Sequence, residues 1–144
     1  MVIDVHRDAV ELSDGSQMGT SATVNGEPSA QVMLVMGSRR GGTHPARLGR
    51  TTLSWALKLQ VQMERQYPGL TRPMSLRPER YNQHATPGSV LVEIGTAGDT
   101  LQKALRAGEA FARTWYPSFR DSICRVDRSP ASFSYGKGLG EDRA

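Results

Sequence analysis

The sequence predicts an α/β protein with a largely parallel, twisted sheet flanked by helices. Two continuous apolar runs, 32–36 and 90–94, are typical of strands that are buried on both faces. Two longer segments, 48–67 and 99–116, repeat apolar residues at three- and four-residue steps, as amphipathic helices do. Because these strands and helices alternate along the chain, a sheet covered by helices is the expected arrangement.

The size of the chain and its cysteine content narrow the possibilities. The 144 residues allow one domain of ordinary size. The single cysteine, Cys124, excludes an internal disulfide and a cysteine-based zinc knuckle. No apolar run approaches the ~18 residues that span a bilayer, and no basic segment followed by an apolar stretch opens the chain. We therefore expect neither a transmembrane segment nor a signal peptide in this chain.

The N-terminal third predicts a strand, a loop and a hairpin. Residues 2–5 form a short apolar run, and residues 9–21 are polar and rich in glycine and serine, as loops are. Asn25-Gly26 supplies the positive φ angles of a type I′ turn. Residues 20–24 are therefore expected to pair with the stretch after the turn, which ends in the buried run up to residue 36.

The middle of the chain predicts a loop, a helix and a second loop. Residues 38–45 form a glycine-rich basic loop, and the helix that follows ends at Pro68-Gly69. Leu53, Leu57 and Val61 are expected to widen the apolar face of this helix. Residues 70–89 are rich in proline and are expected to form an ordered loop.

The second helix is expected to begin near Asp99, an N-cap candidate with Gln102 at the capping-box position. Tyr116-Pro117 is expected to end it, so that residues 1–117 form the domain and residues 118–144 an irregular or disordered tail. Its predicted inner face consists of Leu101, Ala104, Leu105, Gly108, Phe111, Ala112 and Trp115.

Charge is concentrated in the middle of the chain. Residues 39–80 contain nine basic and two acidic residues, a net charge of +7, whereas residues 1–38 have a net charge of −4. A basic segment is consistent with an anionic partner such as nucleic acid, a membrane surface or an acidic cell-wall polymer. A solvated basic face explains it equally well.

Glu93 and His6 carry most of the chemical information. Glu93 interrupts the apolar run 90–94, and burying an unpaired carboxylate is costly or raises its pKa. An edge strand that turns Glu93 toward solvent would avoid this cost. His6 follows the first apolar run and suits a metal ligand, a proton carrier or a structural hydrogen-bonding role. Because ligands bind at the carboxyl ends of strands, the two together predict hydrolysis with the carboxylate as general base.

Five short segments, in series from about residue 2 to residue 116, resemble the C-terminal half of the stage II sporulation protein P family. They are Asp4-Val5-His6-Arg7-Asp8, Tyr67-Pro68-Gly69-Leu70 with Arg72-Pro73, Tyr81-Asn82-Gln83, Pro87-Gly88-Ser89 and Leu91-Val92-Glu93-Ile94-Gly95. The resemblance implies a zinc-dependent N-acetylmuramoyl-L-alanine amidase, which cuts the amide between N-acetylmuramic acid and L-alanine. It also implies an amidase-like fold and one Zn²⁺ held by two histidines and a glutamate.

By this resemblance, His6 corresponds to the later histidine ligand and Glu93 to the catalytic glutamate. Arg7 and the segment Tyr81, Asn82 and Gln83 lie in matching motifs and are expected to shape a substrate-binding site. The substrate implied is peptidoglycan, and the implied location is extracytoplasmic.

In the family, the other two zinc ligands precede the motif that contains His6. We therefore expect both ligands and the N-terminal strand or strands to be missing here, which leaves zinc binding and activity of this chain alone in question. Residues that could substitute as ligands are Asp8, Glu11, His44 and His84.

Two other functions stay open at this point. A non-catalytic peptidoglycan-binding module would use the basic segment 39–80. A nucleic-acid-binding domain is less expected, because Trp55 and Tyr67 belong to an apolar helix face and leave few aromatics for base stacking.

Overall fold

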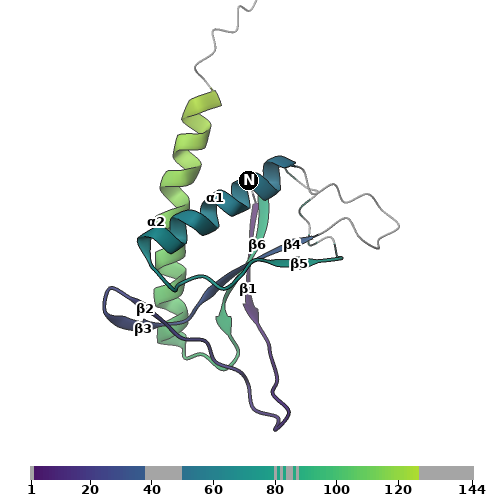
Figure 1. Cartoon of the computed structure of the whole chain (residues 1–144), viewed down its shortest axis with the longest axis vertical. Coiled ribbons are helices and arrows are strands. Elements are labelled where there is room, and N and C mark those ends of the chain that lie inside the picture. The colour runs from purple at the N-terminus through teal and green to yellow at the C-terminus, as the bar shows by residue number, and fades with distance from the viewer. Residues whose placement is uncertain are drawn as a thin grey trace, which may run out of the picture.

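The computed structural model describes residues 2–37, 50–79, 81, 83, 86 and 88–126 and has an α/β fold (Figure 1). Its main sheet has four strands in the order β1-β6-β4-β5. β1–β6 and β4–β5 are parallel pairs, and β4–β6 is antiparallel. The sheet is therefore mixed but mostly parallel, as predicted. The strands are β1 (Val2–Asp8), β4 (Val32–Gly37), β5 (Ser75–Arg77) and β6 (Ser89–Thr96).

A separate two-stranded hairpin is formed by β2 (Ala22–Val24) and β3 (Glu27–Ser29). Asn25 and Gly26 have φ angles of 52° and 83°, which confirms the predicted turn. The prediction that the second arm continues to residue 36 is wrong. After β3 the backbone finds other partners, because the Ala30 amide donates to the Lys103 carbonyl and the Val32 amide to the Leu70 carbonyl.

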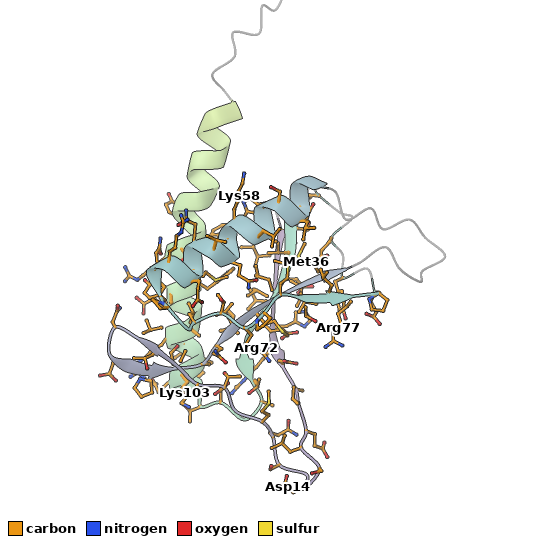
Figure 2. All side chains as sticks on the ribbon, viewed as in Figure 1. Asp14, Met36, Lys58, Arg72, Arg77 and Lys103 are labelled. Carbon is orange, nitrogen blue, oxygen red and sulfur yellow. The ribbon has the colours of Figure 1, made fainter. Side chains whose placement is uncertain are left out.

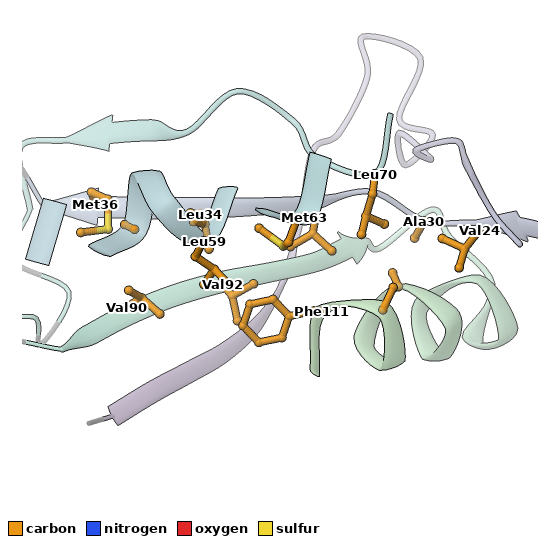
Figure 3. Close-up of a cluster of buried hydrophobic side chains, with 14 residues drawn as sticks. Val24, Ala30, Leu34, Met36, Leu59, Met63, Leu70, Val90, Val92 and Phe111 are labelled. Carbon is orange, nitrogen blue, oxygen red and sulfur yellow. The ribbon is translucent and has the colours of Figure 1, made fainter. Parts of the chain in front are cut away.

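Two helices, α1 (Arg50–Gln66) and α2 (Leu101–Val126), cover one face of the main sheet. Figure 3 shows their apolar side chains packed against those of β4 and β6. Burial of each large apolar side chain contributes roughly 1.5–3 kcal/mol, so this layer supplies most of the folding energy. The fully buried core includes Leu34, Met36, Leu59, Met63, Leu70, Val90 and Val92.

Each helix buries part of the predicted apolar face and exposes the rest. The three- and four-residue repeat of 48–67 is buried on α1 at Thr52, Ala56, Leu59 and Met63, as predicted. On α1, Leu57 and Val61 are about half exposed (49% and 48%) instead of widening the buried face. On α2, Leu101 and Leu105 are 66% and 56% exposed. Phe111 is buried as predicted. The rest of the buried face of α2 consists of small residues, which allow the helix axis to lie close to the sheet. The buried residues of α2 are Ala107, Ala110, Phe111 and Thr114.

The ends of α2 also differ from the prediction. Thr100, rather than Asp99, caps its first turn, because the Lys103 amide donates to Thr100 Oγ1 at 3.3 Å. The helix continues through Tyr116-Pro117 to Val126. A proline inside a helix removes one backbone hydrogen bond, and residues 118–126 contain no further proline or glycine to stop the helix. The remainder of the predicted tail, 127–144, lies outside the described residues.

The segment between α1 and β6 is more regular than the predicted loop, because it contains β5 beside β4. The predicted glycine-rich loop at 38–45 lies outside the described residues. Within the described ranges, neither helix combines the length and apolar character that crossing a bilayer requires.

Candidate functional site

The site lies on the sheet face opposite the two helices. His6 on β1 is the register partner of Glu93 on β6, and Glu93 is in turn the partner of Met33 on β4. Side chains alternate along a strand, so Glu93 points away from the helix layer into which Val92 packs. The prediction that His6 and Glu93 lie on neighbouring strands, on the same face, is confirmed by this register.

Glu93 is a partly buried carboxylate with one oxygen lacking a partner. Its Oε2 is buried and forms no hydrogen bond with any described residue. Burial raises the pKa of Glu93 above its ordinary value, and Asp8 raises it further, while His6 and Arg72 act in the opposite direction. A carboxyl group with a raised pKa is a better proton acceptor than an exposed one, which suits a general base.

His6 is accessible at the edge of this site. Its side chain is 49% exposed, and its Nε2 lies 2.8 Å from Asp4 Oδ1. This contact orients the ring and leaves Nδ1 for another partner. The two residues share one face of β1, because they are two positions apart along the strand.

Arg72 and Asp8 form an ion pair beside Glu93. Arg72 Nη2 lies 2.9 Å from Asp8 Oδ2, and the two side chains are only 15% and 21% exposed. Sequence reasoning assigned no role to Arg72, although the residue lies in one of the family-like segments. A signal was present, since Arg72 stands in a largely apolar stretch from Leu70 to Met74, where an arginine needs a partner.

Arg7 connects β1 to the turn that follows β6. Its Nε donates to the Thr96 carbonyl at 2.8 Å, and its Nη2 donates to the Asp99 carbonyl. Its position coincides with a register shift between His6 and Asp8, which turns its side chain toward this turn. The guanidinium is therefore engaged by backbone, and its predicted contact with substrate stays a prediction.

Gln83 and Tyr81 occupy different positions relative to the site. Gln83 is buried, and its side chain binds the backbone of β4. Its Nε2 donates to the Val35 carbonyl at 2.6 Å, and its Oε1 accepts from the Gly37 amide at 2.7 Å. Tyr81 has a φ of 44°, and its hydroxyl donates to Glu79 at 3.3 Å. Burial raises the pKa of this hydroxyl, Glu79 adds to the effect and Glu93 adds a smaller contribution.

Three other residues named from the sequence, Asn82, His44 and His84, lie outside the described part of the chain. The substrate-binding role of Asn82 therefore stays a prediction, as does the possible metal binding of the two histidines. The substitute ligands Asp8 and Glu11 are described, but Asp8 is paired with Arg72 and Glu11 belongs to the exposed loop after β1.

The described residues do not complete a zinc site. Within ranges 2–37, 50–79 and 88–126 and at 81, 83 and 86, no group of three or more His, Cys, Asp or Glu side chains is placed to hold a metal ion. A catalytic zinc normally has three protein ligands. His6 is the one imidazole among these residues, so the described chain offers one ligand of the kind that the resemblance implies.

Asp99 holds together the turn between β6 and α2. It accepts hydrogen bonds from the amide and hydroxyl of Thr20 at 3.0 and 2.7 Å and from those of Thr96 at 2.9 and 3.1 Å. The backbone is packed equally closely here, since a Cβ on Gly98 would lie 2.5 Å from the Gln17 carbonyl oxygen. This network fixes the carboxyl end of β6 just beyond Glu93.

Comparison with known proteins gives a family match over most of the chain. A family model described as Stage II sporulation protein P matches residues 1–115. Stage II sporulation protein P of Bacillus subtilis (strain 168) is 28% identical over 126 residues, which are 84% of this chain and 29% of the relative. The chain therefore spans less than a third of the length of this curated relative. No solved structure matches the chain.

Proposed function

Because this chain belongs to the stage II sporulation protein P family and is a sporulation-related protein, we propose that it carries the catalytic carboxylate of a peptidoglycan hydrolase. The proposed activity is that of an N-acetylmuramoyl-L-alanine amidase. The observation that supports it is the pairing of His6 with Glu93 on one open face of the sheet, with a buried Glu93 oxygen that has no partner among the described residues.

In the proposed reaction, Glu93 removes a proton from water while the water oxygen attacks the lactyl carbonyl carbon of N-acetylmuramic acid. The carbon–nitrogen bond then breaks, and the proton passes from Glu93 to the departing amine of L-alanine. The products are a carboxylic acid on the sugar and a peptide with a free amino terminus. The raised pKa of Glu93 suits both steps, because the carboxyl group first accepts and then returns a proton.

The proposal includes a zinc ion, because the resemblance to the family implies one. A bound zinc ion would polarise the carbonyl and lower the pKa of water. His6 is the described residue that we propose as a ligand, and further ligands would have to come from outside the described residues. The steps above are therefore assigned only to Glu93.

Peptidoglycan as the substrate and an extracytoplasmic site of action are also proposals. The basic residues described within 39–80 do not gather at Glu93. Figure 2 shows Lys58 on α1, Arg72 at the centre of the sheet and Arg77 at the end of β5. For the described basic residues, charge attraction to an anionic polymer would therefore be spread over several elements rather than concentrated at Glu93.

The proposal is tested by digesting purified peptidoglycan with the natural gene product that contains this chain and identifying the fragments by mass spectrometry. We expect stem peptides with a free L-alanine amino terminus. Glu93→Gln should lower the rate by at least about a hundredfold, the lower range for loss of a general base. Glu109→Gln is the matched control, because Glu109 is an exposed carboxylate paired with Arg113.

Two results would refute the amidase assignment: cleavage at another bond, or equal digestion by the Glu93→Gln variant. Binding to peptidoglycan without cleavage by either protein would favour the non-catalytic wall-binding module. Zinc analysis of the same preparations tests the ligand assignment, because His6→Ala should reduce the bound zinc if His6 is a ligand.

A further inference from the structure

Arg72 belongs to the same row of side chains as Glu93. Thr71 forms a parallel bridge with Val32, and the Arg72 amide donates to the Val32 carbonyl at 2.8 Å. Partners in a sheet point to the same face, and neighbours along a strand point to opposite faces. Since Val32 points into the helix-covered core, Arg72 points to the other face, as do Met33 and Glu93.

The Arg72 side chain must pass over β6. Its backbone lies beside β4, but its ion-pair partner Asp8 belongs to β1. The strand order β1-β6-β4 places β6 between them, and β6 carries Glu93 on this face. The ion pair therefore forms a bridge across the strand that presents the proposed catalytic carboxylate.

Two buried atoms near the Arg72–Asp8 ion pair lack hydrogen-bond partners among the described residues. One of them is a donor and the other is an acceptor. Arg72 Nε is a donor with positive charge, and Glu93 Oε2 is an acceptor with negative charge. Arg72 also favours the ionised form of Glu93 electrostatically, although the structure has no direct hydrogen bond between Arg72 Nε and Glu93 Oε2. A buried donor or acceptor without a partner is costly, so a contact between these atoms would relieve both at once.

We propose that Arg72 is a positioning residue whose Nε–H pairs with the Glu93 carboxylate after a rotation of the two side chains, while Asp8 holds the far end of the guanidinium. The bridge fixes the carboxylate on the open face, and His6 flanks it on the other side. The inference rests on the proposed function, because the position of Glu93 matters for a carboxylate that takes a proton from water. Arg72 itself contacts neither water nor substrate in this scheme.

The test is nuclear magnetic resonance of the arginine Nε–H groups in the isotope-labelled 144-residue chain. In the wild type we expect nuclear Overhauser contacts between Arg72 Hε and the Glu93 Hγ protons. Glu93→Gln should shift the Arg72 Nε–H signal and speed its exchange with water roughly tenfold, the effect of losing a hydrogen bond to a charged group. Arg72→Lys identifies the signal by removing it.

A matched control comes from the exposed pair Arg113 and Glu109, in which Arg113 Nε lies 3.1 Å from Glu109 Oε1. Glu109→Gln should change the Arg113 signal and leave the Arg72 signal in place, and Glu93→Gln should do the opposite. Absence of the Overhauser contacts in the wild type would overturn the inference, and so would an Arg72 signal that ignores Glu93→Gln. The first of these observations needs no variant to fold.

Enzyme kinetics separate this inference from the proposed function. If the gene product digests peptidoglycan, Arg72→Lys should lower kcat about tenfold and leave KM unchanged, because the substrate contacts are retained. An unchanged kcat would overturn the positioning role while the amidase proposal stands. If no digestion occurs with the wild type, the amidase proposal fails, and the resonance experiment still decides whether Arg72 holds Glu93.

Discussion

The two main residues of the site differ in how far their side chains are exposed to solvent. Glu93 is partly buried with one orphaned oxygen, whereas its register partner His6 is half exposed. A half-exposed imidazole can exchange partners with solvent or a ligand, but a buried carboxylate depends on the protein around it. Arg72 and Asp8 supply that surrounding charge, Asp8 from the end of β1 and Arg72 from the segment beside β4.

The proximity of His6 and Glu93 could be predicted from the sequence, because each is embedded in or follows an apolar strand at a similar distance from its start. The Arg72–Asp8 pair could not, since their meeting depends on the strand order and on a side chain that reaches across β6. Likewise, Arg7 and Gln83 lie in conspicuous polar motifs, but their side chains bond to backbone, which a motif does not reveal.

Asp99 is the residue whose charge should matter most for stability. Although burial acts in the other direction, hydrogen bonds from Thr20 and Thr96 hold the pKa of Asp99 below its ordinary value. A carboxyl group of this kind stabilises the fold above its unfolded-state pKa, and the contribution is lost as pH falls through the folded-state pKa. Asp99→Asn should therefore lower the free energy of unfolding by about 1.5–3 kcal/mol at pH 7, the range for hydrogen bonds to a charged group.

Urea unfolding of wild type and Asp99→Asn at pH 7, 5 and 3 measures this difference. The difference in the free energy of unfolding should be full at pH 7 and 5 and smaller at pH 3. At pH 3, below the ordinary pKa of an aspartate, the unfolded wild type gains a proton and is stabilised. Asp14→Asn is the control, because Asp14 also accepts hydrogen bonds from a serine, Ser16, but is exposed. A difference that is as large at pH 3 as at pH 7 would contradict an ionic role for Asp99.

At the level of elements, α2 contacts the sheet largely through small residues, which a prediction based on hydropathy ranks below large apolar ones. The periodic large residues of α2 led to the prediction that Leu101 and Leu105 are buried, but the contact forms through Ala107 and Ala110. β5 was missed because it has three residues and lies in a proline-rich stretch, where pairing with β4 decides its conformation. Both helices and the main buried face of α1 were predictable, whereas the buried face of α2 depended on how closely the backbones approach.

Two glycines, Gly98 before α2 and Gly108 within it, should change the stability of the protein in opposite directions when replaced by alanine. A Cβ on Gly108, inside the helix, would meet Ile94 Cδ1 at 3.7 Å, an ordinary van der Waals contact. Gly108→Ala should stabilise the protein by about 0.5–1 kcal/mol, because alanine has the higher helix propensity. Gly98→Ala should destabilise it, since its Cβ would lie 2.5 Å from the Gln17 carbonyl oxygen, which belongs to the backbone.

Thermal unfolding followed by circular dichroism measures both glycine variants against the wild type. The midpoint should rise for Gly108→Ala and fall for Gly98→Ala. Destabilisation by Gly108→Ala would show that α2 lies closer to β6 than the 3.7 Å contact with Ile94 implies. A neutral Gly98→Ala would show that the Gln17–Met18 backbone can withdraw without loss.

At the scale of the whole molecule, the two faces of the main sheet have different roles. The face under α1 and α2 holds the apolar core, and the opposite face holds Glu93 and its charged neighbours. This arrangement follows from strand alternation, because each residue that points into the core is followed by one that points to the site. Substitutions at the site should therefore alter chemistry more than stability, and core substitutions the reverse.

A matched pair on α1 tests whether the helix layer and the sheet unfold as one unit. Leu59 is 1% exposed and Leu57 is 49% exposed, although both are leucines on the same helix. Leu59→Ala should lower the free energy of unfolding by about 2–5 kcal/mol through lost burial and a cavity. Leu57→Ala should change it by no more than about 0.5 kcal/mol.

Urea unfolding followed by tryptophan fluorescence and by far-ultraviolet circular dichroism should give coincident transitions for both variants, since one core joins the helices to the sheet. Separate transitions would mean that α1 detaches before the sheet unfolds.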